Sequence, residues 1–234
     1  DMISSCPVKI TYVGENTNFA EELAYKLSER LGKNRREFKN EITRKIPKEI
    51  KYFEEKHSVK QARLVIGLRD DISTPDDIYI KAVFDELYGQ SPVSKLFMNV
   101  RERMGLCYHC SSAMDLIKGT MMVNCGIDPA KKEIAKAEIL HQLDEMRQMH
   151  ITDAEFDAAK KSIRSAIKQV YDEPSSMEMW WLGRMLSGRD TSPEDEIARI
   201  EGVTKADVAS AAQKIQLDTV YFMNGTGGEV CEDE

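Results

Sequence analysis

The sequence has no apolar run of 18 residues, so it offers no membrane-spanning helix of ordinary length. It also lacks the histidine pair of a helical zinc site, because none of its four histidines belongs to an H-x-x-E-H motif. No Walker loop, no G-x-G-x-x-G segment and no G-x-S-x-G segment occurs. These absences argue against the nucleotide-binding and serine-nucleophile classes that such motifs mark, and we expect no metal or other cofactor in this chain.

Cysteines are few and odd in number, and they are spread along the whole chain: Cys6, Cys107, Cys110, Cys125 and Cys231. No basic segment followed by an apolar run opens the sequence, so no export signal is visible. We therefore expect reduced thiols and a cytoplasmic location. The opening Asp1-Met2 does not resemble a natural start, and we expect the chain to be part of a longer protein.

Charged residues make up 31% and hydrophobic residues 41% of the chain, which is typical of a folded domain. The net charge of -7 argues against general nucleic-acid binding. The segment Lys33–Lys51 departs from this balance, because it holds eight basic residues and three acidic ones. We interpret it as a solvated loop, and a site for an acidic partner is the alternative.

The hydrophobic pattern predicts strands that end at glycine or turn residues, over residues 8–14, 50–57, 62–68, 107–115, 120–127 and 220–223. The segment 62–68 is the more apolar and is predicted to be central, whereas the charged segment 50–57 is predicted to lie at an edge. Capping residues and helical periodicity predict a helix from Asn18 to Leu31, helices starting at Thr74 and Pro92, and several helices after Lys131.

Short links between neighbouring strands favour antiparallel pairing, and helices clustered in the sequence favour one covered face. We therefore predict an α+β fold with a single, mostly antiparallel sheet and helices packed chiefly on one face. Residues 5–227 are expected to form one domain, and residues 228–234 an acidic, disordered tail.

The segment Cys107-Tyr108-His109-Cys110 is a C-x-x-C motif, which in other settings binds zinc or performs thiol redox chemistry. The surrounding pattern predicts a strand, in which residues three apart point to opposite faces of the sheet. Both sulfurs would then be unable to bind one metal ion without a turn, and no second C-x-x-C completes a site. We therefore expect no zinc here, with a zinc or redox role as the alternative.

The most informative stretch runs from Ser91 to Tyr108 and reads SPVSKLFMNVRERMGLCY. It resembles the S-x-L-F-x-x-(L/V)-R-E-x-x-G-L-x-Y segment in the C-terminal halves of insulinase-like (pitrilysin) zinc metallopeptidases, a family that includes the mitochondrial processing peptidases. Gln61–Gly67 matches the family's strand before the helix pair, and the order of elements matches one family half over residues 5–227. The residues of this stretch are similar to those of a bacterial subgroup that lacks the zinc motif and is often paired with an active homologue.

The resemblance implies a two-part peptidase in which two such halves, each a sheet packed under helices, enclose a chamber. One half carries the zinc, and the other supplies an arginine and a tyrosine, which fall here on Arg101 and Tyr108. Arginine offers forked donors to peptide carbonyls, and a phenol can donate to a developing oxyanion. The chain departs from the family pattern at two positions, since Cys107 replaces the commoner alanine and Gln90 replaces a usual glycine.

The expected function is therefore the non-zinc half of such a peptidase, which holds peptide substrate opposite a zinc site on another half or subunit and does not cleave peptides alone. The expected partners are the N-terminal half of the same protein or a homologous subunit, and a peptide; nucleic acid and membrane are not expected. The alternative is a catalytically silent scaffold or peptide-binding subunit. In that case Arg101 caps its helix and Tyr108 is a half-buried strand residue.

Overall fold

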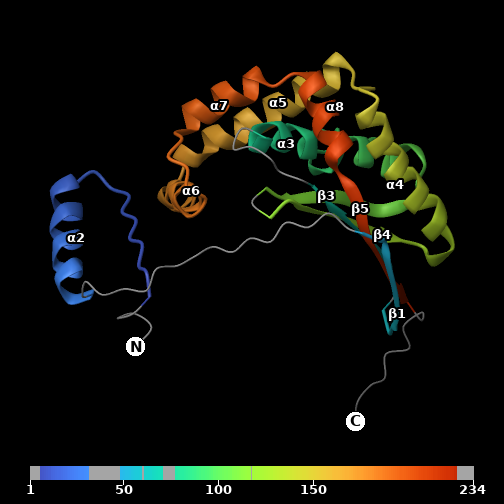
Figure 1. Ribbon diagram of the computed structural model, residues 1–234, viewed down its shortest axis with the longest axis horizontal. Coiled ribbons are helices and arrows are strands. Elements are labelled where there is room, and N and C mark those ends of the chain that lie inside the picture. The colour runs from blue at the N-terminus through green and yellow to red at the C-terminus, as the bar shows by residue number, and fades with distance from the viewer. Residues whose placement is uncertain (1–5, 32–47, 60, 71–76, 117, 226–234) are drawn as a thin grey trace, which may run out of the picture. The chain divides into compact units, whose positions relative to one another are not determined.

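The computed structural model describes residues 6–31, 48–59, 61–70, 77–116 and 118–225 (Figure 1). The chain divides into two compact units, one of residues 1–43 and 166–195, and a larger one of residues 44–165 and 196–234. The larger unit contains the sheet and both residues of the expected site. The single domain over residues 5–227 stays a prediction, and the tail 228–234 and most of Lys33–Lys51 lie outside the described residues.

The larger unit is built on a five-stranded sheet with the order β1-β5-β2-β4-β3. Its strands are β1 Lys51–His57, β2 Ala62–Arg69, β3 Cys107–Asp115, β4 Thr120–Ile127 and β5 Gln216–Gly225. Only β1 and β5 pair in parallel, and the other three pairings are antiparallel. The predicted α+β fold with a mostly antiparallel sheet is therefore confirmed. The positions of β2 at the centre and β1 at an edge are confirmed as well.

Helices account for most of the remaining described residues. They are α2 Thr17–Leu31, α3 Asp77–Asp85, η1 Glu86–Gln90, η2 Leu96–Arg103, η3 Pro129–Lys131, α4 Lys132–Arg147, α5 Asp153–Lys168, η4 Gln169–Tyr171, α6 Pro174–Leu186, α7 Pro193–Gly202 and α8 Lys205–Lys214. The short η1 and η2 are π-helical, and η3 and η4 are 3-10 helices. Figure 1 shows α3, α4 and α8 on the same face of the sheet. None of the helices in the described ranges has the length and apolar character to cross a membrane.

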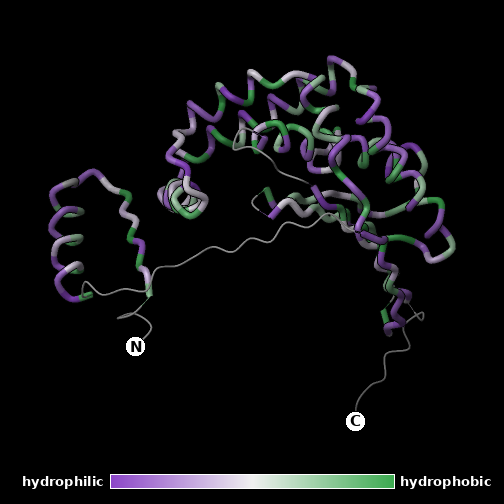
Figure 2. Tube along the Cα trace, viewed as in Figure 1, coloured by the Kyte–Doolittle hydropathy of each residue, from purple (hydrophilic) through white to green (hydrophobic). Residues whose placement is uncertain are grey.

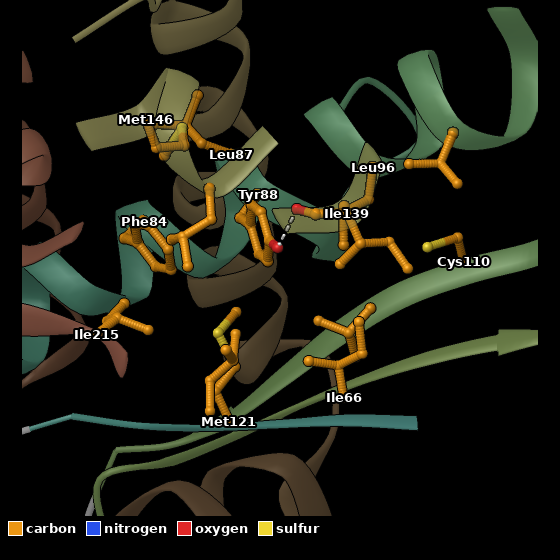
Figure 3. Packing of buried hydrophobic residues seen from close by; sticks show 14 of the residues in the cluster. Ile66, Phe84, Leu87, Tyr88, Leu96, Cys110, Met121, Ile139, Met146 and Ile215 are labelled. Carbon is orange, nitrogen blue, oxygen red and sulfur yellow. Dashed lines mark hydrogen bonds between the residues drawn. The ribbon is translucent and has the colours of Figure 1, made fainter. Parts of the chain in front are cut away.

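The core lies between this helical layer and the sheet. Leu64, Ile66 and Leu68 of β2 are buried while the residues between them are more exposed, because alternate side chains of a strand point to opposite faces. Phe84 and Tyr88 pack above the sheet, and the Tyr88 hydroxyl donates a hydrogen bond to the Ile139 carbonyl at 2.8 Å (Figure 3). In Figure 2 the helices alternate between hydrophobic and hydrophilic residues, as expected of elements with one buried face.

The prediction for the smaller unit is wrong at its first element. Residues 8–14 form no strand, and none of them is buried. Alternation alone does not make a strand, because a strand needs a neighbour to satisfy its backbone groups. The helix that follows is present, but its first turn is capped from Asn16, whose Oδ1 accepts from the Phe19 N–H at 3.1 Å.

Candidate functional site

Tyr108 lies on a β-bulge at the start of the edge strand β3. Cys107 pairs with Ile127 of β4, and His109 pairs with the adjacent Gly126, so Tyr108 is an extra residue without a partner in β4. A bulge bends its strand and redirects side chains, and bulges are common beside active sites. The result here is a tyrosine that is 76% exposed. In the part of the chain that the structure describes, its hydroxyl has no hydrogen-bond partner.

A hollow of about 590 Å³ lies beside this tyrosine, lined by Gln61, Tyr108, Ile127, Asp128 and Pro129. The side chain of Gln61 lies over Gly126, because a Cβ added to that glycine would be 2.9 Å from the glutamine Nε2. One oxygen of the Asp128 carboxylate is occupied locally, since its Oδ1 accepts from the Ala130 N–H at 2.9 Å. The Gln61 amide, the Tyr108 phenol and the second oxygen of the Asp128 carboxylate are thus side-chain polar groups that the hollow offers to a ligand.

Arg101 is placed on η2, shortly before β3. Its side chain is 40% exposed, and its guanidinium lies 4.6 Å from the centre of the Phe97 ring. Its acidic neighbour is Glu102, at 3.5 Å and 51% exposed, and so solvent screens this pair. The guanidinium therefore stays accessible and is held by an aromatic face rather than by a buried carboxylate.

A tight turn joins Arg101 to Tyr108. The N–H of Gly105 donates to the Arg101 carbonyl and the N–H of Leu106 to the Val100 carbonyl, both at 3.1 Å. Gly105 has a φ of 56°, in the left-handed region that glycine adopts without strain. Both accessible side chains therefore lie in one short segment, which consists of a helix end, a turn and a bulge.

Three cysteines meet immediately beside this bulge. Cys110 and Cys125 face each other across β3 and β4, and the extra residue Tyr108 puts Cys107 on the same face of the sheet. The three sulfur atoms all lie within 4.8 Å of one another. Our prediction that Cys107 and Cys110 point to opposite faces is therefore wrong, because it assumed a regular strand and the bulge reverses the alternation.

The three thiols differ in their environment. Hydrogen bonds from Cys110 and Cys125 lower the pKa of Cys107 to about 4, and the charges of His109 and Arg101 favour its thiolate further. The same hydrogen bonds to Cys107 raise the pKa values of Cys110 and Cys125, since each keeps its proton in order to donate it, and burial adds to both shifts. Cys107 is half-buried, whereas the other two are buried.

One residue that holds β3 in place was not predicted from the sequence. Asp85, at the end of α3, is buried, and its carboxylate accepts from Ser112 Oγ at 2.6 Å, the Met114 N–H at 3.0 Å and Gln90 Nε2 at 3.2 Å. Two of these donors belong to β3. Burial raises the pKa of Asp85, although the three donors oppose the shift. The sequence signal that could have revealed this role is the position of the Asp85 carboxylate next to apolar positions of its helix.

A sequence profile described as the peptidase M16 inactive domain matches residues 8–163. The chain belongs to the peptidase M16 family. It is 35% identical to the "Probable inactive metalloprotease YmfF" of Bacillus subtilis, over 78% of this chain and 42% of that protein. It is 28% identical to an "Uncharacterized zinc protease" of Mycobacterium bovis, over 67% of this chain and 36% of that protein. The chain therefore spans less than half the length of these curated relatives.

Solved structures share the fold of this chain. A conserved protein from Enterococcus faecalis superposes with a TM-score of 0.80 at 28% identity, over 89% of this chain and 50% of that chain. A peptidase M16 inactive domain from Pseudomonas fluorescens superposes with a TM-score of 0.74 at 20% identity, over 92% of this chain and 52% of that chain. The predicted resemblance to the non-zinc half of an insulinase-like peptidase is confirmed. The roles of Arg101 and Tyr108 stay predictions.

Proposed function

We propose that this chain is the substrate-holding half of a peptidase M16 assembly, and that it acts opposite a zinc site carried by another half or subunit. The observation that supports this most is the exposure of Tyr108 on its bulge, beside an open hollow. Within the described residues, neither core packing nor a hydrogen bond occupies this phenol, so it is available to a ligand. This chain has no H-x-x-E-H motif to bind the catalytic zinc of the family, so that zinc would be held by the other half or subunit.

Each of the two side chains has a separate task in this proposal. Arg101 binds carbonyl oxygens of the peptide backbone through its planar array of N–H donors, and so contributes to substrate affinity and alignment. Tyr108 donates its hydroxyl hydrogen bond to the scissile carbonyl. That bond strengthens as the oxygen gains negative charge in the transition state. Tyrosine should therefore act mainly on turnover, and arginine on both binding and turnover.

The partner in this proposal is the N-terminal half of the same protein or a homologous subunit, and the substrate is a peptide in the cytoplasm. The second candidate function is a catalytically silent scaffold that binds peptide or pairs with an active homologue. The name of the Bacillus subtilis relative, a "Probable inactive metalloprotease", favours this alternative. The two functions differ in one measurable respect, the dependence of turnover on the Tyr108 hydroxyl.

The experiment uses the chain assembled with its zinc-bearing half and a fluorogenic peptide. Tyr108→Phe removes one hydroxyl, and we expect kcat to fall about tenfold or more with little change in KM. Arg101→Ala should raise KM and lower kcat. The matched control is Tyr52→Phe, which removes the hydroxyl of a tyrosine 64% exposed on the opposite edge strand and should change neither constant. Unchanged turnover in Tyr108→Phe would refute the catalytic role and leave the scaffold function.

A further inference from the structure

The thiols of Cys107, Cys110 and Cys125 form a triangle whose sides are no longer than 4.8 Å. In the largest such triangle, with three sides of 4.8 Å, the centre lies about 2.8 Å from each corner, and zinc–sulfur bonds are about 2.3 Å long. Each sulfur atom therefore needs to move by only about 0.5 Å to reach a shared metal ion. Rotation about the Cα–Cβ bond provides movements of this size without any change in the backbone.

The chemistry of the three ligands is uniform. Thiolate sulfur is a soft ligand that selects Cu⁺ and Zn²⁺ over Mg²⁺, Ca²⁺ and Mn²⁺. Across the described residues, no histidine or carboxylate completes this group as a fourth protein ligand. Three sulfur ligands suit trigonal Cu⁺, or tetrahedral Zn²⁺ with a water molecule in the fourth position. Because Cys107 is only half-buried, an ion can enter from its side.

We propose that Cys107, Cys110 and Cys125 form a binding site for one thiophilic metal ion, Zn²⁺ or Cu⁺. The thiols that are protonated lose their protons to water when the ion binds. The site is built from residues of β3 and β4 alone, so it does not depend on the proposed function.

A bound ion would also fix the bulge. Cys107 precedes Tyr108, and Cys110 follows it by two residues, so a metal ion held by both would clamp the segment that presents the tyrosine. Cys125 would tie this segment to β4. The exposed tyrosine would then be oriented by the ligands on either side of it, much as outer-shell contacts orient catalytic groups elsewhere.

The experiment titrates the reduced, full chain with Co²⁺ under argon, then displaces Co²⁺ with Zn²⁺, and titrates Cu⁺ separately. We expect one equivalent of metal per chain and intense near-ultraviolet absorption from thiolate-to-Co²⁺ charge transfer. Cys107→Ser, at the half-buried position, should weaken binding at least about tenfold, since loss of an outer-shell partner alone costs this much. Cys6→Ser is the matched control and should leave the titration unchanged.

Cys110 and Cys125 are buried, so their alanine variants are first checked for native circular dichroism. Protection of the wild-type thiols then gives a measurement that needs no variant. Zn²⁺ should slow the alkylation of these three cysteines, read by peptide mass spectrometry, and leave that of Cys6 unchanged. The proposal is overturned if no charge-transfer absorption develops, if Cys107→Ser binds as tightly as the wild type, or if two of the three thiols are joined in a disulfide that metal does not prevent.

Discussion

Asp85 shows how a single buried carboxylate can hold a functional strand. It is 7% exposed and accepts hydrogen bonds from both Ser112 and Met114 of β3. Removing the acceptor would leave the buried Ser112 hydroxyl and the partly buried Met114 N–H unpaired, which costs more than the hydrogen bonds themselves contribute. We expect Asp85→Ala to lower the free energy of unfolding by about 2–4 kcal/mol in urea titrations. Asp85→Asn keeps the shape and one acceptor and should lose less; equal stability of all three proteins would contradict the prediction.

The same residue predicts a dependence of stability on pH. Burial raises the pKa of Asp85 in the folded chain above its ordinary value of 3.8, so the folded chain binds this proton more tightly than the unfolded chain. The stabilisation from proton uptake is complete below pH 3.8 and is lost as the pH rises through the raised pKa. We expect the unfolding free energy of the wild type to fall, relative to that of Asp85→Asn, over this range. A difference that stays constant with pH would show that Asp85 titrates normally.

The contact between η1 and β3 depends on a residue without a side chain. A Cβ at Gly89 would lie 2.5 Å from Ser112 Oγ and 2.6 Å from the Ser112 backbone nitrogen. We expect Gly89→Ala to destabilise the chain by about 1–3 kcal/mol, because the backbone of the strand has to move. The control is Gly202→Ala at the end of α7, where a Cβ meets nothing within 4 Å. That variant should be neutral or slightly stabilising in the same denaturation measurement.

At the scale of elements, hydrophobic periodicity and turn residues predict where strands and helices lie. The central position of β2 follows from its apolar run, and the antiparallel pairing of β3 with β4 follows from the short link between two neighbouring predicted strands. The bulge at Tyr108 could not be predicted in this way. A strand with one extra residue has the same composition and nearly the same pattern as a regular strand. The meeting of three thiols was therefore missed, although all three cysteines lie in predicted strands.

At the scale of the whole molecule, the chain should need a partner for peptide cleavage. The sequence has no H-x-x-E-H motif, and the chain covers 42% of its Bacillus subtilis relative. We expect no hydrolysis of a fluorogenic peptide by the chain alone in the presence of Zn²⁺, and hydrolysis when the zinc-bearing half is added. Cleavage by the chain alone that a chelator abolishes would contradict this. Repeating that assay with Cys107→Ser would show whether the thiol cluster were its source.

The order of strands has a consequence for how the chain is made. The strand β5, Gln216–Gly225, is the last to leave the ribosome, yet it lies between β1 and β2 in the finished sheet. Until it emerges, β2 has a neighbour on one side only, and β1 has none. Nascent chains stalled before residue 216 should therefore expose to chaperones and proteases the edge of β1 and the edge of β2 that β5 later covers. Assembly of this sheet is thus completed only after translation has passed the last strand.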